Sequence, residues 1–205
     1  SRTLTTSDYA SFADLTAYTV SVQAIGVSNY QDSLESNKTS ARTRGLPQSI
    51  TVDTSGVVDA TGAWISGTWY TATIGASRVT PTSLQTQMGS ASATLQTAGS
   101  ITVSNAVASP NASSSLNLNS TGSNVTVNAA ISGLSGFTVT CDSGTFASNS
   151  SGTISAGGDV TIQCSTITTA GAVSTSGSTY FTSSGATSDL TAGANITISG
   201  VGEEL

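Results

Sequence analysis

Histidine is absent from this chain of 205 residues, and charged residues make up only 8% of it. Ordinary soluble chains carry about 25% charged residues. Without histidine, the chain cannot build a Ser-His-Asp triad, a histidine general base or a histidine-ligated metal site from its own residues. The sequence therefore predicts a protein that is not an enzyme and that holds no cofactor and no metal.

Positive charge is scarce and confined to one end of the chain. The 5 Lys and Arg residues all precede residue 79, and the net charge is −6. A segment without cations cannot neutralise phosphates, so we expect no nucleic-acid partner and no attraction to anionic lipids. There is no run of about 18 apolar residues, so we expect no membrane insertion. The chain begins at Ser1 without a signal-peptide pattern, which we interpret as processing or as excision from a longer chain.

Serine and threonine are abundant where charged residues are scarce, and together they make up roughly a third of the chain. Many of them alternate with β-branched residues, and period-two alternation is typical of half-buried strands. Low charge combined with Ser, Thr, Asn and Gly is common in secreted, surface-exposed β-proteins. The sequence therefore predicts an all-β, extracellular or cell-surface protein.

The first 46 residues contain strand patterns. Residues 18–24 alternate large and small polar side chains, with Tyr18, Val20 and Val22 on one face, and residues 34–44 read as a polar edge strand. Residues 9–15 read as a further strand. The apolar series resembles the last strands of a fibronectin type III domain; its members are Phe12, Leu15, Tyr18, Val20, Val22 and Ala24.

The fibronectin resemblance implies a partial sandwich. A full domain of this class needs about seven strands in about 100 residues, and the strands that would come first are missing. We therefore expect residues 1–46 to form a fibronectin-like or immunoglobulin-like β-sandwich segment whose apolar face requires a cover.

Residues 47–92 read as a β connector. Strands are predicted at 50–52 and within 64–74, with Trp64 and Trp69 as core or edge packing residues. This segment also contains the best helix signal of the chain.

That helix is predicted from Pro81 to Met88. Thr80 is a suitable N-cap before proline at the first helical position, Leu84 and Met88 lie on one face, and Gly89 provides a stop.

Residues 93–205 contain a repeated pattern: an apolar residue, a turn with glycine, and an apolar-Thr-apolar strand. The Thr-bearing strands begin at Ile101, Val125, Val160 and Ile196, with spacings of 24, 35 and 36. A further strand is predicted at 137–141.

This style resembles the repeats of filamentous-haemagglutinin-like exoproteins over residues 79–201. The resemblance implies a parallel β-helix of the kind that builds long surface adhesins. An antiparallel sandwich of short strands would read in a similar way, and the irregular spacing favours that alternative. The fold is thus predicted as β-solenoid-like or antiparallel β-sandwich repeats after the N-terminal segment.

Cys141 and Cys164 each lie four residues after the start of a strand. Equal offsets on neighbouring strands place the two sulfurs side by side, within the reach of a disulfide. Two cysteines without histidine or a Cys-x-x-Cys motif argue against metal or redox use. We therefore predict a disulfide between them.

Two alternative functions remain, one enzymatic and one ice-binding. Asp142 and Asp159 flank the cysteine strands, and their approach would be one element of a polysaccharide-active β-helix enzyme. Outward threonines could form an ice-binding face if each coil showed two of them in register. Six Asn-x-Ser/Thr sites are candidates for N-glycosylation: Asn37, Asn111, Asn119, Asn124, Asn149 and Asn195.

Repeats, uncharged polar walls and the lack of a catalytic constellation favour a structural or adhesive role in a surface fibre, with cell-surface glycans as candidate partners. The alternative is a phage tail-fibre segment. Self-association into a homopolymer is expected through strand complementation, with residues 1–7 or 196–205 as donor strands.

Overall fold

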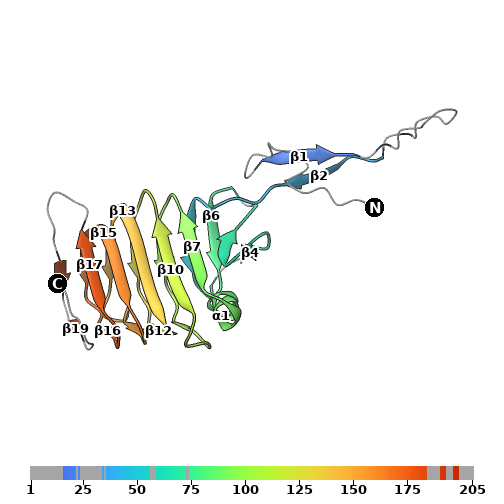
Figure 1. Cartoon of the computed structure of the whole chain (residues 1–205). Coiled ribbons are helices and arrows are strands. Elements are labelled where there is room, and N and C mark those ends of the chain that lie inside the picture. Colours follow the sequence, from blue (N-terminus) through green and yellow to red (C-terminus); the bar gives the residue numbers. More distant parts are fainter. Residues whose placement is uncertain are drawn as a thin grey trace.

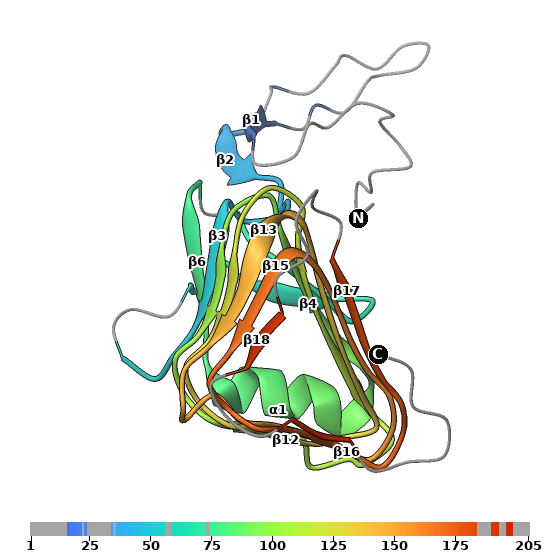
Figure 2. The same cartoon turned by 90° about the vertical axis from the view of Figure 1, so that its left-hand side faces the viewer.

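The structure, a computed structural model, describes residues 16–21, 23, 34, 36–55, 59–72, 74–183, 190–192 and 196–198. These residues form strands and a single helix (Figure 1). Most of the strands stack in parallel in three columns around one core, which gives a three-sided β-solenoid (Figure 2). The prediction of an all-β protein is confirmed, and the solenoid is the architecture that the repeats adopt.

The three columns are named here by the order in which the chain visits them from Ala93 onward, and one passage through all three is a coil. Column one contains β7 (Ala93–Thr97), β10 (Ser115–Ser120), the first part of β13 (Gly136–Ser148), the first part of β15 (Val160–Thr169) and β17 (Thr179–Ser183). Column two contains β6 (Ala76–Val79), β3 (Ser49–Val52), β8 (Ile101–Val103), β11 (Val125–Val127), the second parts of β13 and β15, and β18 (Leu190–Ala192). Column three contains β9 (Val107–Ala108), β12 (Ile131–Leu134), β14 (Ile154–Ala156), β16 (Val173–Thr175) and β19 (Ile196–Ile198).

The antiparallel sandwich that the irregular spacing favours is wrong for the repeats. Their strands pair in parallel with the strand one coil away, as in Leu116 with Ala93 and Phe137 with Leu116. Successive partners are 23 and 21 residues apart here, and 19 residues apart where Val160 pairs with Thr179. The coil is therefore shorter than two of the three spacings read from the sequence.

The misleading spacings arise because the same turn pattern serves all three corners of the solenoid. Ile101 and Val125 begin strands of column two and are register partners. Val160, in contrast, begins a strand of column one, and Ile196 begins a strand of column three. Distances between strands of different columns are not coil lengths.

The period-two alternation of apolar and polar residues explains which side chains form the core. Side chains at alternate positions of each strand point inward, and the intervening Thr, Ser, Asn and Gln residues point outward, as in the pattern of β10. At the corners, inward hydroxyls satisfy backbone carbonyls: Ser120 Oγ donates to Gly99 O (2.7 Å), and Thr97 Oγ1 donates to Pro47 O (2.7 Å). The largest fully buried side chains are Phe137, Phe146, Ile50, Leu84, Met88, Leu95, Ile101, Leu116, Leu118, Ile131, Leu134 and Ile154.

The helix α1 (Pro81–Ser90) covers one end of this core and lies across the triangular section (Figure 2). Thr80 caps it, because its Oγ1 accepts a hydrogen bond from Ser83 N (3.1 Å). Leu84 and Met88 are fully buried against the solenoid. The predicted helix is confirmed, but the predicted stop at Gly89 is wrong. The helix continues to Ser90 and ends where the chain turns into β7.

The segment predicted as a connector supplies the first layers of the solenoid. β4 (Ala63–Ile65) and β5 (Thr68–Tyr70) form an antiparallel hairpin, and β5 pairs with β7 in column one. Trp69 is buried and donates to Ser77 Oγ (2.9 Å), while Trp64 packs edge-on against it with ring centroids 5.2 Å apart. The prediction that both tryptophans serve packing is confirmed.

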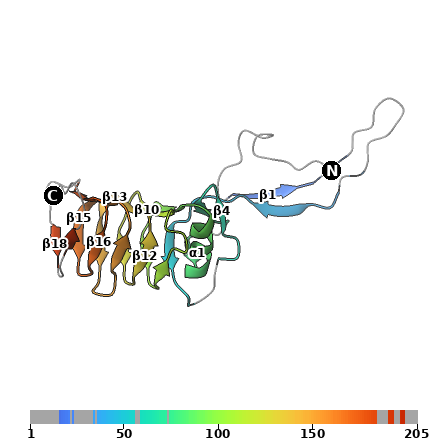
Figure 3. The ribbon, with the colours of Figure 1, turned by 60° about the horizontal axis from the view of Figure 1, so that its bottom comes forward.

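The N-terminal part is described only in pieces. β1 (Ala17–Val20) and β2 (Thr39–Arg42) form a two-stranded antiparallel sheet beyond the end of the solenoid that carries α1 (Figure 3). Tyr18 is half-buried there. The predicted strand at 9–15 lies outside the described residues, as does Val22, so the fibronectin-like sandwich stays a prediction.

Close stacking at one corner gives a test of this architecture. A Cβ added at Gly144 would lie 1.9 Å from the backbone oxygen of Ser123 in the preceding coil. We expect Gly144→Ala to lower the free energy of unfolding by about 1–3 kcal/mol, because backbone must shift. Gly157→Ala is the matched control, since its Cβ would meet Leu134 O at an ordinary 3.6 Å. Equal denaturation midpoints for the two variants would contradict the corner stacking.

Candidate binding face

The predicted disulfide is present. Cys141 and Cys164 are register partners on β13 and β15, with Cα atoms 4.5 Å apart, and the structure joins them. Both are fully buried. The bond links two successive coils at the corner between columns one and two, so its place is structural and away from the outward faces.

The candidate glycosylation sites differ in their surroundings. Asn149 is exposed in a turn, where its Oδ1 accepts hydrogen bonds from the backbone of Ser151 and Gly152 (2.9 Å each). Asn119 lies inside a strand of column one. Asn37 and Asn124 are exposed, Asn111 is half-buried, and Asn195 lies outside the described residues. Their glycosylation stays a prediction.

The structure does not bring Asp142 and Asp159 together. Asp142 follows Cys141 and Asp159 precedes Val160, so the two acids lie at opposite ends of the column-one strands. The strands between them separate the acids by about 15 Å or more. Over the described ranges, there is no group of three or more Cys, Asp or Glu side chains that could hold a metal ion.

A third carboxylate, that of Asp59, lies in the loop before β4. It accepts hydrogen bonds from Thr61 N (3.0 Å), from Ser77 Oγ (2.8 Å) and from the hydroxyl of Thr71. Ser77 is also the partner of the Trp69 indole. This network ties the loop before β4 to the hairpin, which is a structural use of the acid.

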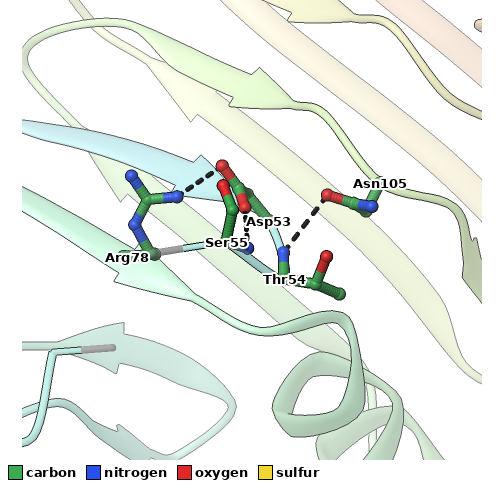
Figure 4. Close-up of polar contacts among 5 residues, drawn as sticks. All are labelled: Asp53, Thr54, Ser55, Arg78 and Asn105. Atoms are coloured by element: carbon green, nitrogen blue, oxygen red, sulfur yellow. Dashed lines mark hydrogen bonds and ion pairs between the residues drawn. The ribbon is translucent and has the colours of Figure 1, made fainter. Parts of the chain in front are cut away.

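One ion pair joins the ends of two column-two strands (Figure 4). Asp53 follows β3 and is paired with Arg78 of β6, and the next loop residue, Thr54, donates its N–H to Asn105 Oδ1 (3.2 Å). Hydrogen bonds from the Ser55 side chain and backbone lower the pKa of the Asp53 carboxyl, and Arg78 lowers it further. These contacts hold together the loops that follow β3 and β8.

The lowered pKa predicts a defined pH dependence. The ionised Asp53 carboxylate makes its full contribution to stability above its unfolded pKa of about 3.8. This contribution is lost as the pH falls through the lower pKa of the folded state. We expect Asp53→Asn to have a lower Tm than the parent chain at neutral pH, and the difference to shrink below pH 3.8. Ser55→Ala should raise the pKa of Asp53 and move this loss to higher pH. A Tm difference that stays constant into strong acid would contradict the assignment.

Column one has the broadest outward surface. Its strands lie side by side in Figure 1, and each presents two outward residues two positions apart, which register aligns into two rows about 7 Å apart. We call these two rows the column-one face. One row is Thr94, Asn117, Thr138, Thr161 and Tyr180, and the other is Gln96, Asn119, Thr140, Gln163 and Thr182.

The column-one face carries no charged side chain among these ten residues. Asn117 Nδ2 donates to Thr94 Oγ1 of the neighbouring coil (3.4 Å). Within the described structure, the buried Oδ1 of Asn119 has no hydrogen-bond partner. Tyr180 is 41% exposed and is one of the few large apolar side chains on the surface. The face therefore offers amides, hydroxyls and one aromatic ring to a partner.

The other columns offer less. Column two has one continuous outward row, in which Thr51, Thr102 and Thr126 are aligned and Ala147 follows. β13 and β15 add one further outward pair, Thr145 and Thr166. Column three has strands of two to four residues. In the described coils of column one, only Thr138 and Thr140 form a Thr-x-Thr pair, so the regular double threonine row of an ice-binding face is not built.

The alternation of the sequence predicts which threonines point outward. It does not predict which outward residues of different coils are aligned in a row. No residue of the face other than Asn119 was singled out from the sequence, and Asn119 only as a glycosylation candidate. The signal that could have found the face is the length of the strands, because only strands of five or more residues can present two outward side chains between buried ones.

No protein-family model, curated protein or solved structure matches this chain. Its function is therefore argued from its own surfaces. In the parts of the chain that the structure describes, no helix has the length and the hydrophobicity needed to cross a membrane.

Proposed function

We propose that this chain is a structural or adhesive segment of an extracellular fibre. The observation that carries the proposal is the stack of parallel coils with outward rows of uncharged Thr, Ser, Asn and Gln residues. Such a stack is stiff along its axis and presents the same polar chemistry coil after coil. The resemblance of residues 79–201 to filamentous-haemagglutinin-like exoproteins supports the same role, because that resemblance implies a parallel β-helix.

The disulfide supports an extracellular location. Disulfides persist in oxidising compartments and are rare where thiols are kept reduced. Cys141 and Cys164 are joined and buried in the wall between two coils. Glycans at the exposed Asn37, Asn124 and Asn149 would add solubility to a surface with little charge.

A phage tail-fibre segment is the second candidate. The predicted fibronectin-like character of residues 1–46 supports it, since fibronectin-like units also precede β-rich fibres in such assemblies. Both candidates place the chain in an elongated extracellular structure, and they differ in whether a cell or a virion carries it.

Assembly into a homopolymer through strand contacts is part of the proposal. Residues 196–198 pair as β19 with β16 of the same chain, with Ile196 opposite Val173. Donation of this segment to another subunit would require it to leave its own coil. Residues 1–7, the other proposed donor, lie outside the described residues.

Immunogold electron microscopy of the cells that produce the chain tests the proposal. Gold on filaments at the cell surface is the expected result, and gold on virion tails would select the second candidate. Gold confined to the cytoplasm would refute both. An antibody raised against the purified chain and producer cells that lack its gene provide the reagent and the control.

A further inference from the structure

We infer that the column-one face binds an extended, neutral polysaccharide, with Tyr180 as a stacking platform and the amides of Asn119 and Gln163 as hydrogen-bonding groups. The inference rests on the proposed extracellular function and names a partner for it. Three features of the face carry it: its chemistry, its lack of charge and its periodicity.

The chemistry suits a sugar. A pyranose ring has an apolar face of C–H groups and an edge of hydroxyls that both donate and accept. Tyr180, exposed at 41%, offers an aromatic plane for the apolar face. Side-chain amides carry two donors and an acceptor with two lone pairs, which match hydroxyls in both directions.

The Gln163 amide is exposed, whereas the Asn119 amide has a buried oxygen. In the described structure, Asn119 Oδ1 has no donor, so a ligand hydroxyl can satisfy it after rotation of the side chain without breaking a hydrogen bond of the protein. Asn119 lies between Gln96 and Thr140 in its row, and Gln163 comes next and is exposed. Three of the four side chains in this part of the row are amides.

The charge of the face selects the class of partner. The face has no cation for a phosphate, sulfate or carboxylate, and the acids Asp142 and Asp159 lie at the two ends of its strands. An anionic partner would be repelled and a cationic one would find no anion on the face itself. A neutral polymer meets neither penalty.

The periodicity selects a polymer over a single sugar. The outward positions repeat every coil, about 4.8 Å along the axis, and the five described coils span about 20 Å. One sugar would touch one or two weak sites. A chain laid along the rows would engage many of them at once, and linked weak contacts add to a useful affinity.

Binding isotherms on microcrystalline cellulose and on chitin test the inference. We expect the intact chain to bind at least one of them, with an affinity that is the same at 50 mM and 500 mM NaCl, because no charges are paired. Tyr180→Ala should weaken binding about tenfold, the equivalent of one lost aromatic contact. Gln163→Ala should weaken it by a smaller factor.

The matched controls lie on column two. Thr102→Ala and Thr126→Ala remove outward side chains from a single row and should leave the isotherms unchanged. Circular dichroism and Tm confirm that each variant is folded. Absence of binding to both polysaccharides, or an equal loss in the column-two variants, overturns the inference. Thermal hysteresis without polysaccharide binding would overturn it in favour of ice.

The result of the polysaccharide-binding test can be distinguished from the result of the immunogold test of the proposed function. Gold on surface filaments together with no polysaccharide binding would leave the fibre standing and remove the partner. Cytoplasmic gold together with specific binding would do the reverse.

Discussion

Replacing Leu84 with alanine is expected to lower the free energy of unfolding by about 3–5 kcal/mol. Leu84 belongs to α1 and is fully buried on the side of the helix that covers the end of the solenoid core (Figure 2). Truncation leaves a cavity against the first coils that a helix fixed at its N-cap cannot fill. In a chain of this length, Tm should fall by roughly 6–20 °C.

Thr86→Ala provides the control within the same helix. Thr86 is exposed, and alanine has a higher helix propensity, so the variant should stay within about 0.5 kcal/mol of the parent. Urea unfolding followed by circular dichroism measures both. Similar midpoints for the two variants would show that α1 does not cover the core.

Removing the disulfide is expected to have the next largest effect. The bond closes a loop with a sequence separation of 23 residues between two coils. In the chain-entropy account, a loop of that size contributes about 3 kcal/mol, because the cross-link restricts the unfolded chain. The double variant Cys141→Ala/Cys164→Ala should therefore unfold about 6–12 °C below the parent.

Two comparisons isolate the bond itself. The parent chain in a reducing agent should approach the Tm of the double variant. Thr140→Ala/Gln163→Ala alters the neighbouring register pair, which points outward, and should cost less than about 1 kcal/mol. An unchanged Tm after verified reduction would mean that the bond adds no stability to the stacked coils.

Several features were determined by the sequence alone, because they depend on interactions between residues close in the chain. Alternation of apolar and polar residues is sufficient for the strands, since successive side chains point to opposite faces. Thr80 before Pro81 is sufficient for the start of the helix, since it satisfies free backbone N–H groups. Cysteines at equal offsets from two strand starts predicted the disulfide, because parallel neighbours in register bring equal offsets together.

The order of stacking was decided only by the tertiary structure. An apolar residue, a turn with glycine and an apolar-Thr-apolar strand occur at every corner, so the pattern does not say which corner a given copy forms. Ile101, Val160 and Ile196 look alike in the sequence and belong to three different columns. Among the strands from β7 onward, parallel pairing joins residues 19 to 24 positions apart, and the choice among such pairings depends on which coils fit at the corners.

The alignment of residues on the column-one face was also decided by the tertiary structure. The sequence shows that Asn119 and Thr140 point away from the core if their strands are half-buried, but it cannot align one with the other. Their pairing is fixed by the length of the coil between them, which includes the corners and the strands of columns two and three. Rows of side chains on a solenoid are therefore a property of coil length, and coil length is set by packing in three dimensions.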